Sequence, residues 1–310
     1  MTTAAPLFHS SGNLTADRRY AFGQELAERG DVAAAADLFA QAVEVAPDFV
    51  SAWFALGEAH VRLRDTAKAA VAFQRAQALD PSDRRGAGLQ LMRLGAIPLA
   101  HMPADYVRTL FDQYAPRFDT ALVEGLSYRG PELLLAAVST VCMDLNRDLH
   151  FKSALDLGCG TGLGGAAFRP FVDHLAGVDI AAGMIRQARG KAIYDHLSVG
   201  DMIPFLDEQT TAGFDLVFAA DVFAYFPGLT PLAAASARVL APAGLFAFSV
   251  ETHEGDGVVL GEKLRYAHGA AHVRAALAQA GLALLRLDPA VTRKEGGQDV
   301  PGLIAVAMRR

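Results

Sequence analysis

The sequence has 310 residues, of which 52% are hydrophobic, and its formal net charge is −6 at pH 7. This length is typical of about two domains of roughly 150 residues each, with enough apolar side chains for folded cores, which excludes a disordered chain. The acidic balance and the lack of long basic runs argue against nucleic acid as the main partner.

The N-terminal residues and the cysteines indicate the compartment. The start of the sequence has no basic stretch followed by an apolar core, and no apolar stretch is long enough to span a membrane. Cys142 and Cys159 are too few for a disulfide framework and lack the spacing of a metal site. We therefore expect a cytoplasmic protein with no membrane partner and no metal.

Two segments near the start of the chain align with each other at a spacing of 34 residues. In such a pattern small residues let paired helices approach, a phenylalanine fills the gap, and a proline begins the next connection. The matched positions are Phe22-Gly23 with Leu56-Gly57, Leu26 with His60, Ala35 with Ala69, Phe39 with Phe73, Ala42 with Ala76 and Pro47 with Pro81, and Trp53 is the aromatic residue that opens a unit.

This pattern resembles the tetratricopeptide repeat family. The resemblance implies a small all-α domain over residues 14–95, made of two repeats and a capping helix near Leu89 to Leu94. Two repeats offer only a short concave groove, so the domain either packs within the chain, binds a protein partner or associates with a second copy. Residues 96–104, which contain Pro98 and Pro103, predict a linker.

From Asp105 to the C-terminus, amphipathic helical patterns alternate with short apolar runs, which is typical of an α/β sheet with crossover helices. The last two strands flank a turn at Glu295 to Gln298 and predict an antiparallel hairpin. A helix is predicted over residues 269–281. The predicted strands are 153–157, 174–179, 196–199, 214–219, 245–250, 282–294 and 302–308.

The first of these strands leads into "LDLGCGTG", residues 155–162. Gly160, Gly162 and Gly165 match the dinucleotide pattern G-x-G-x-x-G, whereas Gly158, Gly160 and Gly162 match the offset pattern G-x-G-x-G. Glycine lets the backbone bend sharply and come close to a ligand. The glycine spacing by itself leaves open both a dinucleotide and another ligand that contains a ribose and an adenine.

Three further motifs follow in order, "VDI" with "AGMI" (178–185), "VGDM" (199–202) and "FDLVFAADVFAYF" (214–226). In this order and spacing, the motifs resemble class I S-adenosylmethionine-dependent methyltransferases over residues 105–310. The segments "LFDQYAPRFDTALVEGLSYRGPELL" (110–134) and "RKEGGQDVPGL" (293–303) further resemble a bacterial group of tetratricopeptide-fused methyltransferases. The resemblance implies a Rossmann-like, doubly wound seven-stranded sheet with an antiparallel C-terminal hairpin, and S-adenosylmethionine as the cofactor.

The resemblance also assigns cofactor contacts to acidic residues near three strand ends. Asp156 precedes the glycine loop, where an acid suits the ammonium of S-adenosylmethionine but not a pyrophosphate. Asp179 would accept hydrogen bonds from the ribose hydroxyls, as in dinucleotide sites, and Asp201 would meet the adenine amino group. Asp179 and Asp201 could instead cap helices or form turns. The other cofactor candidates are Gly158, Gly160, Gly162, Ile180, Met184, Met202 and Arg129, the last for the methionine carboxylate or, alternatively, for a surface salt bridge.

Methyl transfer needs few catalytic groups, because the enzyme mainly aligns the acceptor and excludes water. A hydroxyl acceptor benefits from a base, whereas a carboxylate or a free amine does not need one. The catalytic candidates are His253 as a general base or a solvated loop histidine, Asp221, Tyr225 and His268. Alternatively, His268 and Tyr266 start a helix beside the site. Phe226 is a candidate for the wall, and Phe111, Tyr114 and Phe118 share one helix face that forms either core or a lid over the substrate.

These observations predict a methyltransferase acting on a small-molecule or carrier-bound acceptor, with oxygen as the acceptor atom. A protein methyltransferase whose repeats recruit the substrate is the first alternative. A scaffold in which the repeats act and the methyltransferase fold is non-catalytic is the second, and a dehydrogenase is the third.

Overall fold

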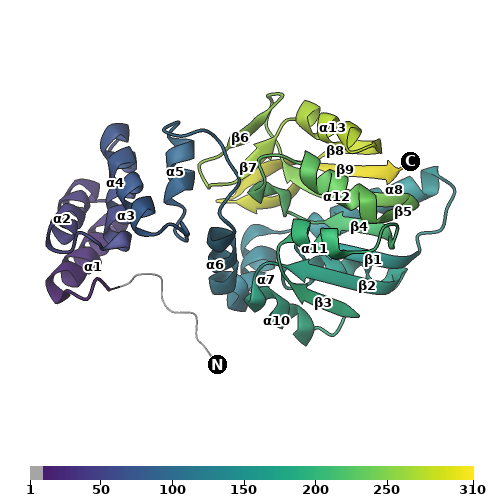
Figure 1. Ribbon diagram of the computed structural model, residues 1–310, viewed down its shortest axis with the longest axis horizontal. Helices are drawn as coiled ribbons and strands as arrows, with labels where there is room; N and C mark the ends of the chain where they lie inside the picture. Colours follow the sequence, from purple (N-terminus) through teal and green to yellow (C-terminus); the bar gives the residue numbers. More distant parts are fainter. Residues whose placement is uncertain (1–9) are drawn as a thin grey trace. The chain divides into compact units, whose positions relative to one another are not determined.

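Paired helices make up the first of the two compact units into which the chain divides, Met1–Tyr106 and Val107–Arg310. The structure is a computed structural model that describes residues 10–310, apart from the side chains of residues 123 and 124. The helices of the first unit are α1 (Leu14–Glu28), α2 (Val32–Val45), α3 (Val50–Arg62), α4 (Thr66–Leu79) and α5 (Ala87–Arg93) (Figure 1).

The predicted repeat is visible in two equivalent close contacts between helices. A Cβ added at Gly23 would lie 2.7 Å from the ring of Phe39, and one added at Gly57 would lie 2.6 Å from the ring of Phe73. Glycine at these positions therefore lets each pair of helices close on a phenylalanine. The capping helix predicted near Leu89 to Leu94 is α5.

Short helices precede the sheet in the second unit. They are α6 (Ala104–Tyr114), which begins in the segment predicted as a linker, η1 (Ala115–Arg117), α7 (Phe118–Thr120), η2 (Ala121–Gly125) and α8 (Gly130–Asp144). The helices that follow are α9 (Leu163–Phe168), η3 (Arg169–Phe171), α10 (Ala182–Gly190), α11 (Met202–Glu208), η4 (Phe223–Tyr225), α12 (Thr230–Val239) and α13 (Ala270–Gln279).

The sheet of the second unit has the strand order β3-β2-β1-β4-β5, with all five strands parallel, and β9 pairs antiparallel with β5 and with β8. This arrangement confirms the predicted doubly wound sheet with a C-terminal hairpin. The strand order reverses between β1 and β4, and open α/β sheets bind ligands outside the carboxyl ends of the strands at such a point. The strands are β1 (Phe151–Leu157), β2 (Val172–Asp179), β3 (His196–Val199), β4 (Phe214–Ala219), β5 (Leu240–Glu251), β8 (Leu282–Glu295) and β9 (Gln298–Arg309).

A short hairpin, β6 (Val258–Leu260) with β7 (Tyr266–His268), was not predicted. Tyr266 and His268 therefore lie in a strand, and the prediction that they start a helix is wrong. Strands of three residues are too short for a periodic pattern to reveal. Glu251 pairs with Gly302 of β9 on one side and with Ala267 of β7 on the other, so β7 lies beyond the carboxyl end of β4.

Two buried clusters pack on the sheet. One joins β-strand side chains to α11, α12 and α13, and the other joins them to α8 and α9. In β1, Leu155 and Leu157 belong to the first cluster and Ala154 to the second, as the alternation of side chains along a strand requires. Helices thus cover both faces of the sheet. Because β1 to β5 are parallel, their carboxyl ends lie at the same edge of it.

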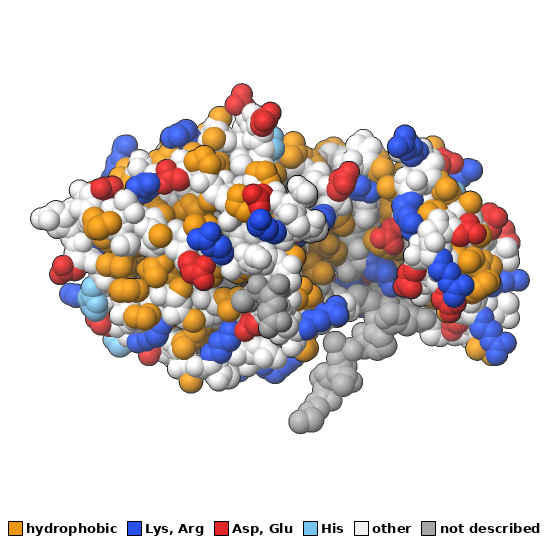
Figure 2. All heavy atoms as spheres, turned by 180° about the vertical axis from the view of Figure 1, so that it is seen from behind, with side chains coloured by type: hydrophobic (Ala, Val, Ile, Leu, Met, Phe, Trp, Pro, Cys, Tyr) orange, Lys and Arg blue, Asp and Glu red, His pale blue; other side chains and the backbone are white. Residues whose placement is uncertain are grey.

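The surface carries mixed charge, and on the face shown in Figure 2 acidic and basic side chains are interspersed over both units. Within the described residues, no helix is long and apolar enough to cross a membrane.

The contact between Gly57 and Phe73 generates a test of the repeat unit. We expect Gly57→Ala to lower the free energy of unfolding by about 1–3 kcal/mol, because a methyl group there overlaps a buried ring. Thermal unfolding of the full chain, followed by circular dichroism, measures the change. Gly190→Ala is the control, because no other atom lies within 4 Å of a Cβ at that position. An unchanged stability of Gly57→Ala would contradict this account of the helix pairing.

Candidate active site

The glycine loop after β1 has left-handed backbone at every second residue. Gly158, Gly160 and Gly162 have φ of 65°, 53° and 93°, which glycine adopts without the strain that other residues would suffer. The N–H of Cys159 donates to the carbonyl of Val178, which ties the loop to β2. The predicted glycine positions therefore form the bend between β1 and α9.

The three glycines face different surroundings. A Cβ at Gly158 would lie 2.7 Å from Val222, and one at Gly162 would lie 3.0 Å from Tyr194, so these two make room for side chains of the protein itself. A Cβ at Gly160 would have only Phe118 nearby, at 3.9 Å. Gly160 is therefore the position at which the loop can approach a ligand closely.

Asp179 ends β2 beside this loop and is 8% exposed. Its Oδ2 accepts a hydrogen bond from the N–H of Gly160 at 2.9 Å, and its Oδ1 accepts one from the N–H of Ala181 at 2.8 Å. Burial raises the pKa of Asp179 to about 6, against the opposing effect of these two bonds. Each oxygen keeps a second lone pair, so the carboxylate can also accept from two neighbouring hydroxyls such as those of a ribose.

Asp156 lies in β1 just before the loop, and its side chain is buried. Its Oδ2 accepts a hydrogen bond from the hydroxyl of Tyr194 at 2.7 Å, and the N–H of Gly165 also donates to the carboxylate. Burial raises the pKa of Asp156 to about 7. The carboxylate can therefore act on a ligand through its charge more readily than through direct contact.

Asp201 is exposed and forms the N-cap of α11, where it accepts a hydrogen bond from the N–H of Ile203 at 3.2 Å. This is the capping role that the sequence left open. Ile180 is half-buried, Met202 belongs to the cluster under α11, and Met184 is fully buried against Ala115. The two methionines are thus core residues in this structure.

Arg129 precedes α8 and lies at the surface. Its side chain is 65% exposed, and its Nε lies 3.9 Å from Glu132. This is the surface salt bridge that the sequence left open as an alternative, and a contact with the methionine carboxylate stays a prediction. Its backbone N–H donates to the carbonyl of Thr292, which joins the start of α8 to β8.

The aromatic residues before β1 lie beside the glycine loop. Phe118 packs edge-on against both Phe111 and Tyr114, and Phe111 packs edge-on against Tyr225 with ring centroids 5.3 Å apart. Phe118 also faces Gly160. The aromatic face and Tyr225 thus form one cluster next to the position where the loop is open.

Two aspartates tether this segment. The N–H of Gly183 in α10 donates to Asp112 at 2.6 Å, and the hydroxyl of Thr161 in the glycine loop donates to Asp119. Lys191 forms an ion pair with Asp119 at 2.7 Å. Residues 111–119 are therefore fastened to the glycine loop and to both ends of α10.

Asp221, predicted as catalytic, is held in an ion pair. It follows β4 with a left-handed φ of 62°, and its carboxylate accepts a hydrogen bond from Arg293. The side chain of Arg293 is 5% exposed and also binds Glu251 and Glu295. An aspartate engaged in this way is a structural anchor rather than a free base.

The charges around Arg293 form a network that joins the loop after β4, the end of β5 and the hairpin of β8 and β9. Arg265 binds Glu251 and Glu295, and Lys263 binds Glu295. Burial opposes the charge of Glu295, but hydrogen bonds from Lys263 and Arg293 lower its pKa to about 2. Although burial opposes the charge of Arg293 too, the neighbouring carboxylates raise its pKa. Arg293 and Glu295 therefore both stay ionised near neutral pH.

The two predicted histidines are also engaged. Nδ1 of His253 accepts from the N–H of Gly255 at 3.0 Å, and its Nε2 lies 3.0 Å from the carbonyl oxygen of Gly257, so both ring nitrogens serve its own loop. His268 is fully buried, its Nε2 lies 3.2 Å from the carbonyl oxygen of Phe223, and burial lowers its pKa to about 4. His253 is therefore a loop histidine, which is the alternative to a general base that the sequence left open. His268 stays neutral near pH 7.

Phe226 packs against the cluster under α11, α12 and α13, edge-on to Phe223. The carbonyl of Phe223 is the acceptor that faces His268, so β7 supports the turn that carries both Tyr225 and Phe226. Tyr225 thus joins the aromatic cluster, Phe226 packs on the core, and their role in the wall of the site stays a prediction.

Three residues that hold this site together were not predicted. Tyr194 precedes a short edge strand, and Asp119 lies in a segment of irregular helix, so neither belongs to a periodic pattern. Arg293 alone carried a signal, because it stands on a strand in "VTRKE" next to Lys294, and one of two adjacent strand residues must face inward.

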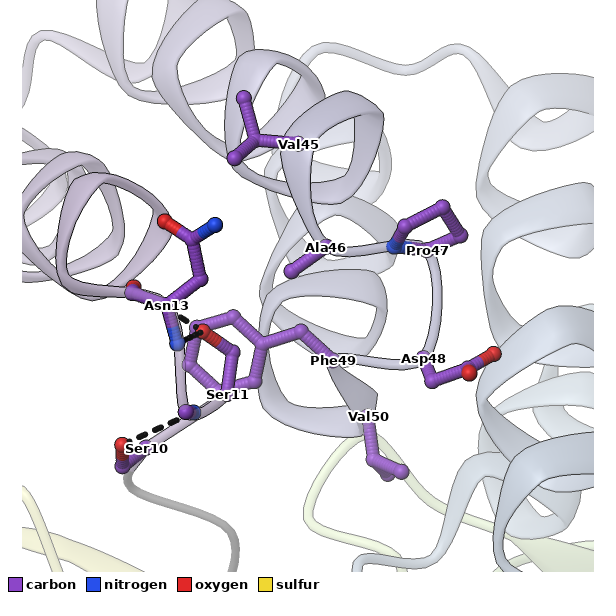
Figure 3. A pocket seen from close by; sticks show the side chains of 10 residues that line it. Ser10, Ser11, Asn13, Val45, Ala46, Pro47, Asp48, Phe49 and Val50 are labelled. Atoms are coloured by element: carbon purple, nitrogen blue, oxygen red, sulfur yellow. Dashed lines mark hydrogen bonds between the residues drawn. The ribbon is translucent and has the colours of Figure 1, made fainter.

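The first unit has a hollow of its own, with a volume of about 340 Å³. It lies between the start of α1 and the turn from α2 to α3, and Figure 3 shows Ser10, Ser11 and Asn13 on one side of it and residues 45–50 on the other. Phe49 at its base is buried, and it packs against Tyr20 with ring centroids 5.0 Å apart.

Comparisons with known proteins agree with both units. Residues 155–248 match a family model described as a methyltransferase domain, and residues 20–84 match one described as a tetratricopeptide repeat. The chain is 38% identical over 103 residues to methyltransferase-like protein 27 of Homo sapiens, which covers 32% of this chain and 40% of that protein. It is 31% identical over 128 residues to malonyl-[acyl-carrier protein] O-methyltransferase of Serratia marcescens, with 41% and 48% covered.

The chain thus spans about half of these relatives' length or less. Among solved structures, it resembles Burkholderia thailandensis 1,6-didemethyltoxoflavin-N1-methyltransferase with bound 1,6-didemethyltoxoflavin and S-adenosylhomocysteine, with a TM-score of 0.52 and 17% identity. The likeness covers 69% of this chain and 92% of that chain, and it shows the fold. The chain therefore contains a methyltransferase domain, matched over residues 155–248 and lying in the second unit, and S-adenosylmethionine is the cofactor that this domain type indicates.

The charge network generates a test. We expect Arg293→Met to lower the free energy of unfolding by about 3–5 kcal/mol, because it leaves Asp221, Glu251 and Glu295 without their shared buried partner. Chemical denaturation at pH 7 measures this loss. Lys294→Met is the control, since Lys294 and its partner Asp299 are both more than half exposed. Equal stability of the two variants would contradict the role of the network.

Proposed function

We propose that this chain, which carries a methyltransferase domain behind tetratricopeptide repeats, is an enzyme that transfers a methyl group from S-adenosylmethionine to oxygen on a small-molecule or carrier-bound acceptor. The observation that carries the proposal is the pairing of Asp179 with Gly160 at the open part of the glycine loop. This pairing places a hydroxyl-accepting carboxylate beside backbone that a ligand can approach. The glycine loop follows β1, where the strand order reverses, and open α/β sheets bind ligands at such a point.

The residues present suit this cofactor. Asp179 would accept from the ribose hydroxyls, Asp201 would accept from the adenine amino group, and the charge of Asp156 would favour the ammonium. A pyrophosphate gains nothing from a second acid this close, which argues against a dinucleotide. When bound, S-adenosylmethionine supplies a methyl group on a sulfonium, so the protein needs mainly to align the acceptor and keep water out.

Three side chains predicted as catalytic are engaged elsewhere, and this bears on the kind of acceptor. Asp221 is paired with Arg293, both nitrogens of His253 serve its loop, and His268 is buried and neutral. An acceptor that already carries a negative charge and a free lone pair needs no base. We therefore propose a carboxylate oxygen, so that the product is a methyl ester. The similarity to an O-methyltransferase named for a malonyl carrier protein supports this assignment.

The aromatic cluster would exclude water from the transfer. Phe111, Phe118 and Tyr225 lie next to Gly160, and Asp112 and Asp119 fasten their segment to the glycine loop and α10. A covered, apolar acceptor site strengthens the electrostatic attraction between an anionic acceptor and a sulfonium.

The repeats support a second candidate, the methylation of a protein. Tetratricopeptide repeats form concave binding surfaces, and the repeat unit here exposes Leu14, Phe22 and Val71 by 51–65%. A third candidate is a scaffold in which the methyltransferase fold is non-catalytic, since a fold alone does not fix an activity.

Transfer to a carboxylate oxygen has a chemical signature. The full chain, incubated with cell extract and S-adenosylmethionine labelled in its methyl group, should give a small or carrier-bound product that releases labelled methanol in mild base. Label that is stable to base would contradict an ester and indicate an ether or an amine. Label in proteins other than acyl carriers would support the second candidate, and no transfer at all would support the scaffold.

The role of Asp179 has its own test. We expect Asp179→Ala to weaken the binding of S-adenosylhomocysteine about 100-fold, because it removes acceptors for two hydroxyls and frees the loop. Isothermal titration calorimetry measures the affinity. The matched control is Asp173→Ala, an exposed carboxylate on the same strand, which should bind like the unmodified chain. Equal affinities for the two variants would contradict the proposed site.

A further inference from the structure

Tyr194 lies under the glycine loop, although it belongs to a different part of the chain. It stands between α10 and β3, next to Asp195, whose N–H donates to the carbonyl of Leu175 and whose carboxylate accepts from the N–H of the same residue. Arg169 also binds the Asp195 carboxylate, at 2.7 Å. These bonds fasten the segment to β2 and hold the neighbouring tyrosine in place.

Three glycines make room for the Tyr194 ring. A Cβ at Gly162 would lie 3.0 Å from the ring, one at Gly177 would lie 2.9 Å from it, and one at Gly165 would collide with its hydroxyl end. Gly165 completes the dinucleotide pattern in the sequence. In the structure, however, Tyr194 occupies the space that a side chain at position 165 would take. The ring therefore packs against the glycine loop at Gly162 and Gly165, whereas Gly160 has only Phe118 nearby.

The hydroxyl of Tyr194 donates a hydrogen bond to the carboxylate of Asp156. The bond to Oδ2 is 2.7 Å long, and Asp156 is 2% exposed, so water does not compete for it. Burial, followed by the charge of Asp156, raises the pKa of Tyr194 far above its usual range, so the hydroxyl is a donor at every physiological pH. The function proposed above requires Asp156 to carry a charge, but gives Tyr194 no part.

We propose that Tyr194 is a positioning residue of the cofactor site, whose hydroxyl holds the buried Asp156 carboxylate and favours its charged form, which attracts the ammonium of S-adenosylmethionine. The inference rests on the proposed function, because it takes that cofactor as the ligand. It adds a residue from outside every motif that the sequence revealed.

The groups around Asp156 decide how its charge depends on pH. Burial raises its pKa to about 7, the bond from Tyr194 lowers it, Asp179 at the end of β2 raises it, and the N–H of Gly165 lowers it. The nearby groups Cys159 in the glycine loop and Tyr128 before α8 have their own pKa values raised by burial, so both stay neutral near pH 7. Loss of the Tyr194 hydroxyl should therefore raise the pKa of Asp156.

The test is the affinity for S-adenosylhomocysteine, measured by isothermal titration calorimetry between pH 6 and 8.5. In the unmodified chain the affinity should rise with pH through about 7, as Asp156 ionises. Tyr194→Phe keeps the ring and removes the hydroxyl. If the pKa of Asp156 rises by about one unit, binding should be about fivefold weaker at pH 7 and nearly restored at pH 8.5.

Two further variants separate this effect from damage to the fold. Asp156→Asn should bind weakly with no rise through pH 7, and adding Tyr194→Phe to it should cause no further pH-dependent change. Tyr20→Phe, which loses a hydroxyl that binds Gln24 in the repeats, should bind like the unmodified chain at every pH. Tyr194→Phe that binds normally, or that is weakened equally at all pH values, would overturn the proposal. Failure of the unmodified chain to bind at any pH would instead overturn the proposed function, and the inference with it.

Discussion

The close approach of backbone at the end of β1 is the constraint on which the rest of the site depends. Gly158 must pass Val222 of the loop after β4, and Gly162 must pass Tyr194, which leaves Gly160 as the open position. Each of these glycines has left-handed φ, so the bend and the packing demand the same residue type. The loop thus owes its shape to side chains of the protein and offers only its middle to a ligand.

A second constraint holds the opposite wall. The loop after β4, the end of β5 and the hairpin of β8 and β9 each supply a carboxylate to one shared buried partner. Arg293 joins them through Asp221, Glu251 and Glu295. Charges that look catalytic from their place at strand ends are used here for structure, and this leaves the chemistry to alignment.

The sequence predicted those features that are local in the chain. The glycine loop, Asp179 at a strand end and the C-terminal hairpin follow from short patterns, and the structure shows each of them where the patterns put them. The roles of Asp221 and His253 could not be predicted, because the partner of Asp221 lies 72 residues away and the ring of His253 folds back on its own loop. Tyr194 was missed for the same reason, since only tertiary packing brings it under Gly165.

The central claim is that the glycine loop and Asp179 form the binding site for S-adenosylmethionine. A crystal structure of the full chain with S-adenosylhomocysteine tests it most directly. The account predicts both ribose hydroxyls on the Asp179 carboxylate and the ligand against Gly160, with Tyr194 still bonded to Asp156. A ligand bound elsewhere, or a nicotinamide dinucleotide bound in the loop in preference to S-adenosylhomocysteine, would contradict it.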